Sequence, residues 1–208
     1  ETVKKKLGGL HSAKILLCSV DFAEIEEYQA KGEWEKSAEV LSDAAATLQQ
    51  AGADYIVICT NTMHKVAPQI QSRISIPLIH IADATADALE NAGVKTVALL
   101  GTKYTMTQDF YKNKLTDRGI RVIVPDEPDI ETVNRVIYDE LCRGIISPDS
   151  RHAYTEIIGK LKANGAQGVI LGCTEIGLLI HQEDSPLPVF DTTVIHARKA
   201  ALLSVRCP

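Results

Sequence analysis

The sequence lacks the features that mark membrane-spanning, secreted and nucleic-acid-binding proteins. None of its apolar runs approaches the roughly 18 residues of a membrane-spanning helix, and no secretory signal opens the chain. Basic residues are not in excess, because 22 Lys and Arg against 27 Asp and Glu give a formal net charge of -5. We therefore expect a chain that binds neither membranes nor nucleic acid.

Cysteine is sparse and irregularly spaced. The five cysteines are an odd number, and the sequence has no CxxC, no HExxH and no cluster of Cys and His. These absences argue against a disulfide framework and against a metal site, and they favour a reducing, cytoplasmic setting. Cys18 and Cys142 are interpreted as small buried hydrophobes, and Cys207 as an incidental terminal residue.

Apolar runs alternate with amphipathic stretches along the whole chain. The runs are rich in β-branched residues and do not alternate with polar ones, which is typical of parallel strands buried on both faces. The order of strand and helix predicts an α/β fold with parallel sheets flanked by helices. The expected strands are Ala13–Val20, Tyr55–Cys59, Pro77–Ile81, Thr96–Leu100, Arg121–Val124, Gly168–Leu171 and Pro188–Phe190. The expected helices are 33–50, 62–72, 82–92, 106–118, 129–143, 151–164 and 192–205.

The sequence also contains an internal repeat. Ala51–Thr60 (AGADYIVICT) returns as Asn164–Thr174 (NGAQGVILGCT), and Ile76–His80 (IPLIH) returns as Leu187–Asp191 (LPVFD). Matched order at similar spacing predicts two pseudo-symmetric lobes with the active site in the cleft between them. We expect lobe one to comprise residues 1–92 completed by the C-terminal helix 192–208, and lobe two to comprise 93–191.

The repeat has an unmatched part at the start of the chain. Val94–Met106 forms a strand and loop that open lobe two, whereas lobe one begins with Glu1–Gly9, which reads as the end of a helix without an initiator Met. We therefore expect a strand and loop of roughly 20–30 residues to be missing from lobe one.

In both repeats a cysteine stands at the carboxyl end of a buried strand, which is the edge where open α/β sheets bind ligands. Cys59 is followed by Thr60, Asn61 and Thr62, and Cys173 by Thr174 and Glu175. These residues are expected to begin helices whose N-termini lower thiol pKa values and hold carboxylates. Two thiols on opposite sides of one carbon suit stereoinversion, because one removes a proton and the other delivers one.

Two other features lie near these motifs. Thr102 and Thr105 follow the Thr96–Leu100 strand at the same edge of the sheet and are expected to contact the ligand. His64 and Lys65 are interpreted as solvated residues of the helix after Cys59.

These motifs resemble those of the aspartate/glutamate racemase family. The likeness is carried by Ile56–Lys65 (IVICTNTMHK) and Val169–Leu179 (VILGCTEIGLL), and it extends to His80–Thr85, Gly101–Met106 and Phe190–Thr192. It implies racemisation of aspartate or glutamate without pyridoxal phosphate or any other cofactor, in a homodimer. It also implies an N-terminal strand and Gly-Gly-Met-Ser loop, which this sequence does not show.

The resemblance also implies roles for individual residues. Cys59 and Cys173 match the two catalytic cysteines, and Asn61, Thr62, Thr174 and Glu175 match substrate-contacting positions. Glu175 is typical of the aspartate branch, since the bacterial glutamate racemases carry His there. Gln29 stands where some members have an Arg for the substrate's side-chain carboxylate, and Cys142 where some have Lys. Both departures remove a cation and leave the preferred amino acid open.

Several other functions remain open from the sequence. A hydantoin racemase or maleate isomerase is possible within the same superfamily, whereas the malonate decarboxylases generally keep one of the two thiols. A truncated, inactive scaffold is the alternative that the unmatched start of the chain favours. A thiol redox protein is disfavoured because CxxC is absent.

Overall fold

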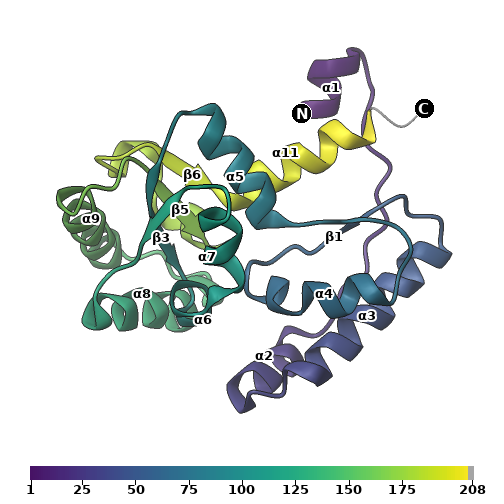
Figure 1. Ribbon diagram of the computed structural model, residues 1–208, viewed down its shortest axis with the longest axis horizontal. Coiled ribbons are helices and arrows are strands. Elements are labelled where there is room, and N and C mark those ends of the chain that lie inside the picture. Colours follow the sequence, from purple (N-terminus) through teal and green to yellow (C-terminus); the bar gives the residue numbers. More distant parts are fainter. Residues whose placement is uncertain (206–208) are drawn as a thin grey trace. The chain divides into compact units, whose positions relative to one another are not determined.

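The computed structural model describes residues 1–205 and shows an α/β fold in which every strand pairing is parallel (Figure 1). Cys207 lies outside the described residues. The backbone forms two compact units. Unit one comprises Glu1–Ile58, Met63–His80 and the described residues from Ala197 onward, and unit two comprises Cys59–Thr62 and Ile81–His196.

Unit one contains a short parallel sheet and its flanking helices. Strands β1 (Ile56–Val57) and β2 (Leu78–Ile79) pair in the register Ile56 to Leu78. The helices are α1 (Thr2–Leu7), α2 (Phe22–Lys31), α3 (Trp34–Gln50), the 3-10 helix η1 (Thr62–Val66) and α4 (Ala67–Ser72). One apolar cluster joins Ile25 of α2, Ala45 of α3, Ile56 of β1 and Ile70 of α4.

The strand predicted over Ala13–Val20 is wrong. This segment has no regular secondary structure, and its apolar side chains are exposed, with Ile15 at 80% and Leu17 at 82% of their full surface. A strand needs a hydrogen-bonding neighbour, and within residues 1–205 the sheet of unit one consists of β1 and β2 alone. Cys18 is therefore exposed rather than a buried hydrophobe.

Unit two is built on a four-stranded parallel sheet in the order β4-β3-β5-β6. The strands are β3 (Thr96–Gly101), β4 (Arg121–Ile123), β5 (Val169–Gly172) and β6 (Val189–Asp191). The helices are α5 (Ile81–Asn91), α6 (Lys103–Thr107), α7 (Asp109–Thr116), α8 (Glu127–Asp139), η2 (Leu141–Arg143), α9 (Pro148–Ala163), α10 (Ile176–Leu179), η3 (Gln182–Asp184) and the start of α11 (Thr192–Ser204). From Ala197 onward α11 belongs to unit one.

Both faces of this sheet are covered by helices, as the unalternating apolar strands predicted. Ala98 and Leu100 of β3 pack in one cluster with residues of α8 and α9. Val97 and Leu99, which point to the opposite face, pack in a second cluster with residues of α5 and α7. All four side chains are fully buried, so the sheet is the rigid support of unit two.

The units divide the chain at a different place from the expected lobes. The predicted boundary was residue 92, whereas α5 belongs to unit two. The physical reason is apolar packing, because Ile81, Ala86 and Leu89 of α5 join the cluster beneath β3. In the part of the chain that the structure describes, no helix is long and apolar enough to cross a membrane.

Candidate active site

The site begins with a pair of glycines where β3 and β5 end. Gly101 and Gly172 are register partners, so the next residues, Thr102 and Cys173, leave the sheet from adjacent strands. A Cβ at Gly172 would lie 2.8 Å from the Leu100 carbonyl oxygen, and one at Gly101 would lie 2.8 Å from that of Gly172. Only residues without a side chain allow the two strand ends to approach this closely.

The Cys59 motif lies over the end of β5. The Asn61 amide nitrogen Nδ2 donates to the Thr192 hydroxyl at 3.0 Å, and the Thr62 and Thr102 hydroxyl oxygens are 3.0 Å apart. Thr192 follows β6 and Thr102 follows β3, and these are the two strands that flank β5. Since β5 carries Cys173 at its end, the structure brings both cysteine motifs to one edge of one sheet.

A chain of buried hydroxyls fixes one side of this arrangement. The hydroxyl oxygen of Thr102 lies 3.0 Å from that of Thr62 and 3.2 Å from that of Thr105. The same oxygen accepts a hydrogen bond from the Thr105 backbone N–H at 3.3 Å. All three residues are buried. Asn61 and Thr62 were expected to cap the following helix, but their side chains bind Thr192 and Thr102 instead.

Cys173 is paired with a carboxylate. Its thiol donates to Glu175 Oε2 at 3.0 Å, and the Thr174 hydroxyl donates to the same oxygen at 2.6 Å. Burial, followed by the charge of Glu175, raises the pKa of the Cys173 thiol well above its usual value. The prediction that the helix start lowers this pKa is wrong in net effect. The backbone hydrogen bond of Glu175 does lower the pKa, but burial and the Glu175 carboxylate outweigh it.

The environment of Cys59 is different. Cys59 is exposed, and Thr60 beside it is half-buried. In the 3-10 helix that follows in the sequence, His64 is buried, so its interpretation as a solvated residue is wrong, whereas Lys65 is half-buried. The His64 and His80 rings meet edge to face with their centroids 4.5 Å apart, and the Lys65 ammonium nitrogen lies 3.7 Å from the centroid of the Trp34 ring.

Two further predicted positions lie on other elements. Gln29 is buried on α2 of unit one, and its contact with substrate stays a prediction. Cys142 lies on η2 and is exposed, which corrects its interpretation as a core residue. Partial burial of its thiol and the charge of Glu175 raise the pKa of Cys142, so this residue is within electrostatic range of the site.

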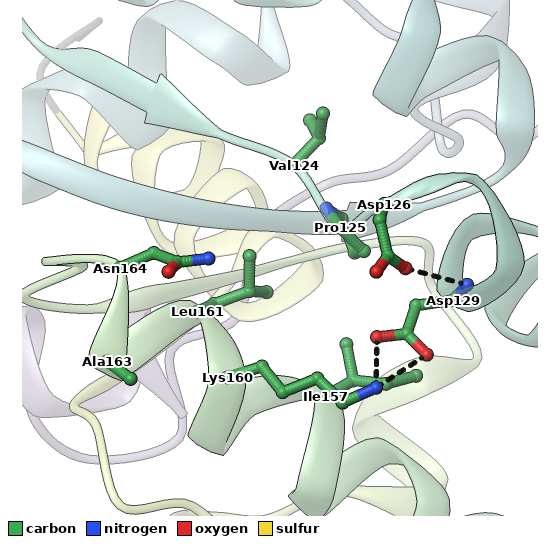
Figure 2. A pocket seen from close by; sticks show the side chains of 9 residues that line it. All are labelled: Val124, Pro125, Asp126, Asp129, Ile157, Lys160, Leu161, Ala163 and Asn164. Carbon is green, nitrogen blue, oxygen red and sulfur yellow. Dashed lines mark hydrogen bonds and ion pairs between the residues drawn. The ribbon is translucent and has the colours of Figure 1, made fainter.

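An open hollow of about 350 Å³ lies elsewhere, between the start of α8 and the end of α9 (Figure 2). Its carboxylates are already engaged, because Asp126 accepts from the Asp129 backbone N–H at 3.2 Å and Asp129 pairs with Lys160 at 2.7 Å. None of the predicted site residues lines it. Among residues 1–205, no group of three or more His, Cys, Asp or Glu side chains is placed to hold a metal ion.

Comparison with known proteins identifies the family. The chain is 57% identical to a Yersinia pestis protein assigned provisionally to the Asp/Glu racemases, with a TM-score of 0.91 over 98% of this chain and 89% of that one. It is 36% identical to an aspartate racemase homologue from Pyrococcus horikoshii, with a TM-score of 0.84 over 97% and 88% of the two chains.

A curated relative gives the reaction class. The broad specificity amino-acid racemase RacX of Bacillus subtilis is 26% identical over 160 residues, which is 75% of this chain and 67% of that protein. The family model for Asp/Glu/hydantoin racemases matches residues 1–200. These findings support amino-acid racemisation in general and a small-molecule substrate. The chain belongs to the Asp/Glu/hydantoin racemase family.

Proposed function

We propose that the protein racemises an acidic amino acid, aspartate or glutamate, without pyridoxal phosphate, using Cys59 and Cys173 as acid and base. The observation that carries this proposal is the placement of Cys59–Thr62 over the strand end that bears Cys173, through the Asn61–Thr192 and Thr62–Thr102 hydrogen bonds. Two thiols at one sheet edge can serve opposite faces of a single α-carbon.

The contacts of Cys173 support a particular starting role for each thiol. Because the thiol of Cys173 donates to Glu175 and its pKa is raised, Cys173 holds a proton in the resting enzyme. In one direction, the Cys59 thiolate removes the α-proton and the Cys173 thiol protonates the opposite face of the carbanion. The product then leaves with Cys59 protonated and Cys173 as thiolate, and the reverse direction starts from that form.

The remaining predicted residues would bind the substrate. Glu175 is the one anion among them and would attract the substrate ammonium, while Asn61, Thr60, Thr62, Thr174, Thr102 and Thr105 supply hydroxyl and amide groups. Gln29 would meet the side-chain carboxylate with an amide rather than a cation, which favours recognition by hydrogen bonds and a relaxed preference between aspartate and glutamate. The working form proposed from the motif resemblance is a cytoplasmic homodimer.

The test is exchange of the α-proton of L-aspartate and L-glutamate with deuterated solvent, in the absence of pyridoxal phosphate. We expect exchange and formation of the D-enantiomer, and loss of racemisation in both directions in Cys59→Ala and in Cys173→Ala. Cys18→Ala and Cys142→Ala are the matched controls, because both residues are exposed and neither stands at the carboxyl end of a strand. Equal losses in all four variants would mean that stability rather than chemistry had been measured.

The same experiment addresses the alternative within the family, whose model also covers hydantoin racemases. Solvent exchange into a 5-substituted hydantoin, with none into either amino acid, would replace the proposed substrate class while leaving the two thiols in their roles. No exchange into any of these compounds by the folded protein would contradict the proposed function.

A further inference from the structure

Thr192 joins the two cysteine motifs through one hydroxyl group. It is the first residue of α11, directly after β6, and it is fully buried. Its Oγ1 donates to the Leu171 carbonyl oxygen at 2.8 Å and accepts from Asn61 Nδ2 at 3.0 Å. Leu171 lies two residues before Cys173, and Asn61 two residues after Cys59. One side chain therefore holds both motifs.

The hydrogen atoms at this hydroxyl determine how Asn61 is oriented. A threonine hydroxyl has one proton, and the Leu171 carbonyl can only accept, so that proton is committed to Leu171. The oxygen of Thr192 then faces Asn61 as an acceptor, which requires the NH₂ group of the Asn61 amide on that side. The opposite orientation would place two acceptors against each other.

The other end of the amide has no partner. Asn61 is 2% exposed, and its Oδ1 accepts no hydrogen bond from any described residue. Buried polar atoms are nearly always paired, so an unpaired acceptor beside a ligand-binding edge points to a donor that the ligand brings. In an amino acid the donor is the ammonium group, whereas both carboxylates are acceptors and would be repelled by Oδ1.

We infer that Thr192 is a positioning residue that fixes the Asn61 amide with its oxygen toward the substrate ammonium, so that the site selects ligands carrying an N–H donor. This inference rests on the proposed function for the identity of the ligand. The orientation of the amide rests on the hydrogen bonds alone. Without the Thr192 hydroxyl the amide can rotate by half a turn and offer its NH₂ group, which favours an acceptor instead.

The test compares Thr192→Val, which keeps the shape and removes the hydroxyl, with Thr192→Ser, which keeps the hydroxyl. The probes are L-aspartate and succinate, which share two carboxylates and differ in the ammonium. In the Val variant we expect the KM for L-aspartate to rise roughly 10- to 100-fold, the range for one hydrogen bond to a charged group, with a smaller change in kcat. Inhibition by succinate should stay within about threefold of wild type, and the Ser variant should behave as wild type.

Equal weakening of L-aspartate and succinate in the Val variant would overturn the inference, because a general disturbance of the site moves both. An unchanged KM for L-aspartate would overturn it as well. Thr192→Ala replaces the Val variant if the latter unfolds at a lower temperature than the Ser variant.

A second readout does not depend on turnover. The Asn61 side-chain NH₂ signals, assigned by their loss in Asn61→Asp, should exchange slowly with solvent in wild type and in Thr192→Ser, and faster in Thr192→Val. Unchanged exchange in the Val variant refutes the positioning role even if the protein racemises amino acids. Faster exchange in a protein that acts on no amino acid keeps the positioning role and refutes the proposed function.

Discussion

Replacing Gly172 by Ala should damage both the fold and the site, because Gly172 stands where β3 and β5 approach most closely. The added Cβ would lie 2.8 Å from the Leu100 carbonyl oxygen and 2.9 Å from Leu99 Cδ1. The first contact is with backbone, and it is relieved only by moving one strand of the β3–β5 ladder away from the other. Both leucines are fully buried, so the surrounding core cannot yield freely.

The magnitude follows from the cost of overpacking. Inserting one carbon into a packed interior reduces the free energy of unfolding by about 1–3 kcal/mol, which for a chain of this size lowers Tm by roughly 2 to 12 °C. Turnover should fall about tenfold or more, since Cys173 follows Gly172 and moves with the strand end. Thermal and urea unfolding, together with the racemisation assay, measure both effects.

Gly159→Ala is the matched control. Gly159 lies inside α9, and a Cβ there meets no atom within 4 Å. The same substitution should therefore raise the free energy of unfolding by roughly 0.5–1 kcal/mol, because alanine is the better helix residue, and leave turnover unchanged. A Gly172→Ala protein with the same Tm and the same turnover as wild type would refute the reasoning about the strand ends.

Two further predictions concern charge. Glu175→Gln removes the anion beside Cys173, so the Cys173 thiolate should form at lower pH than in wild type, although burial still holds the thiol pKa above its usual range. The test measures the rate at which Cys173 is alkylated as a function of pH. Identical pH profiles for the two proteins would contradict the prediction. Lys160→Met breaks the pair with Asp129 at the hollow of Figure 2. Because Lys160 is 58% exposed, the midpoint of thermal unfolding should stay close to that of wild type, and turnover should change by less than about twofold. A large loss of turnover would show that this hollow takes part in function.

The parallel sheet of unit two was predictable from the sequence because its strands carry their evidence locally. Residues 97–100 and 169–171 are uninterrupted apolar runs, and a strand buried on both faces needs that composition whatever its neighbours are. The predicted position of the candidate site rests on the same evidence, since the carboxyl end of a parallel strand is set by chain direction alone.

Some of the failures arise because structure depends on residues distant in the chain, and others because a local pattern is weak. Ala13–Val20 has a strand-like composition, but a strand forms only where another backbone completes its hydrogen bonds. Cys142 is predicted to be a core residue because lone cysteines are usually buried, yet it lies on an exposed turn after α8. Helix α2 was missed although Asp21 and Gly32 provide an N-cap and a left-handed C-cap, because few of its side chains are buried and its apolar pattern is weak.

Thr192 shows the same limit within the site. Its partner Asn61 is 131 positions away, and neither residue has a local pattern that reveals the contact. The sequence placed Phe190–Thr192 among the family-like segments without indicating a role. The role proposed for the Thr192 hydroxyl rests on two contacts that only the structure shows: it donates to the Leu171 carbonyl oxygen and accepts from the Asn61 amide.

The two cysteine motifs share a sequence pattern but differ in charge at one equivalent position. Cys59-Thr60 is followed by Asn61, and Cys173-Thr174 by Glu175. The amide at the first position binds a neutral hydroxyl, whereas the carboxylate at the second accepts directly from the thiol. The repeat therefore supplies two similarly placed thiols, and the exchange of one amide for one carboxylate makes their surroundings unequal. Under the proposed function, this difference keeps the resting proton on Cys173 and decides which enantiomer the resting enzyme can accept first.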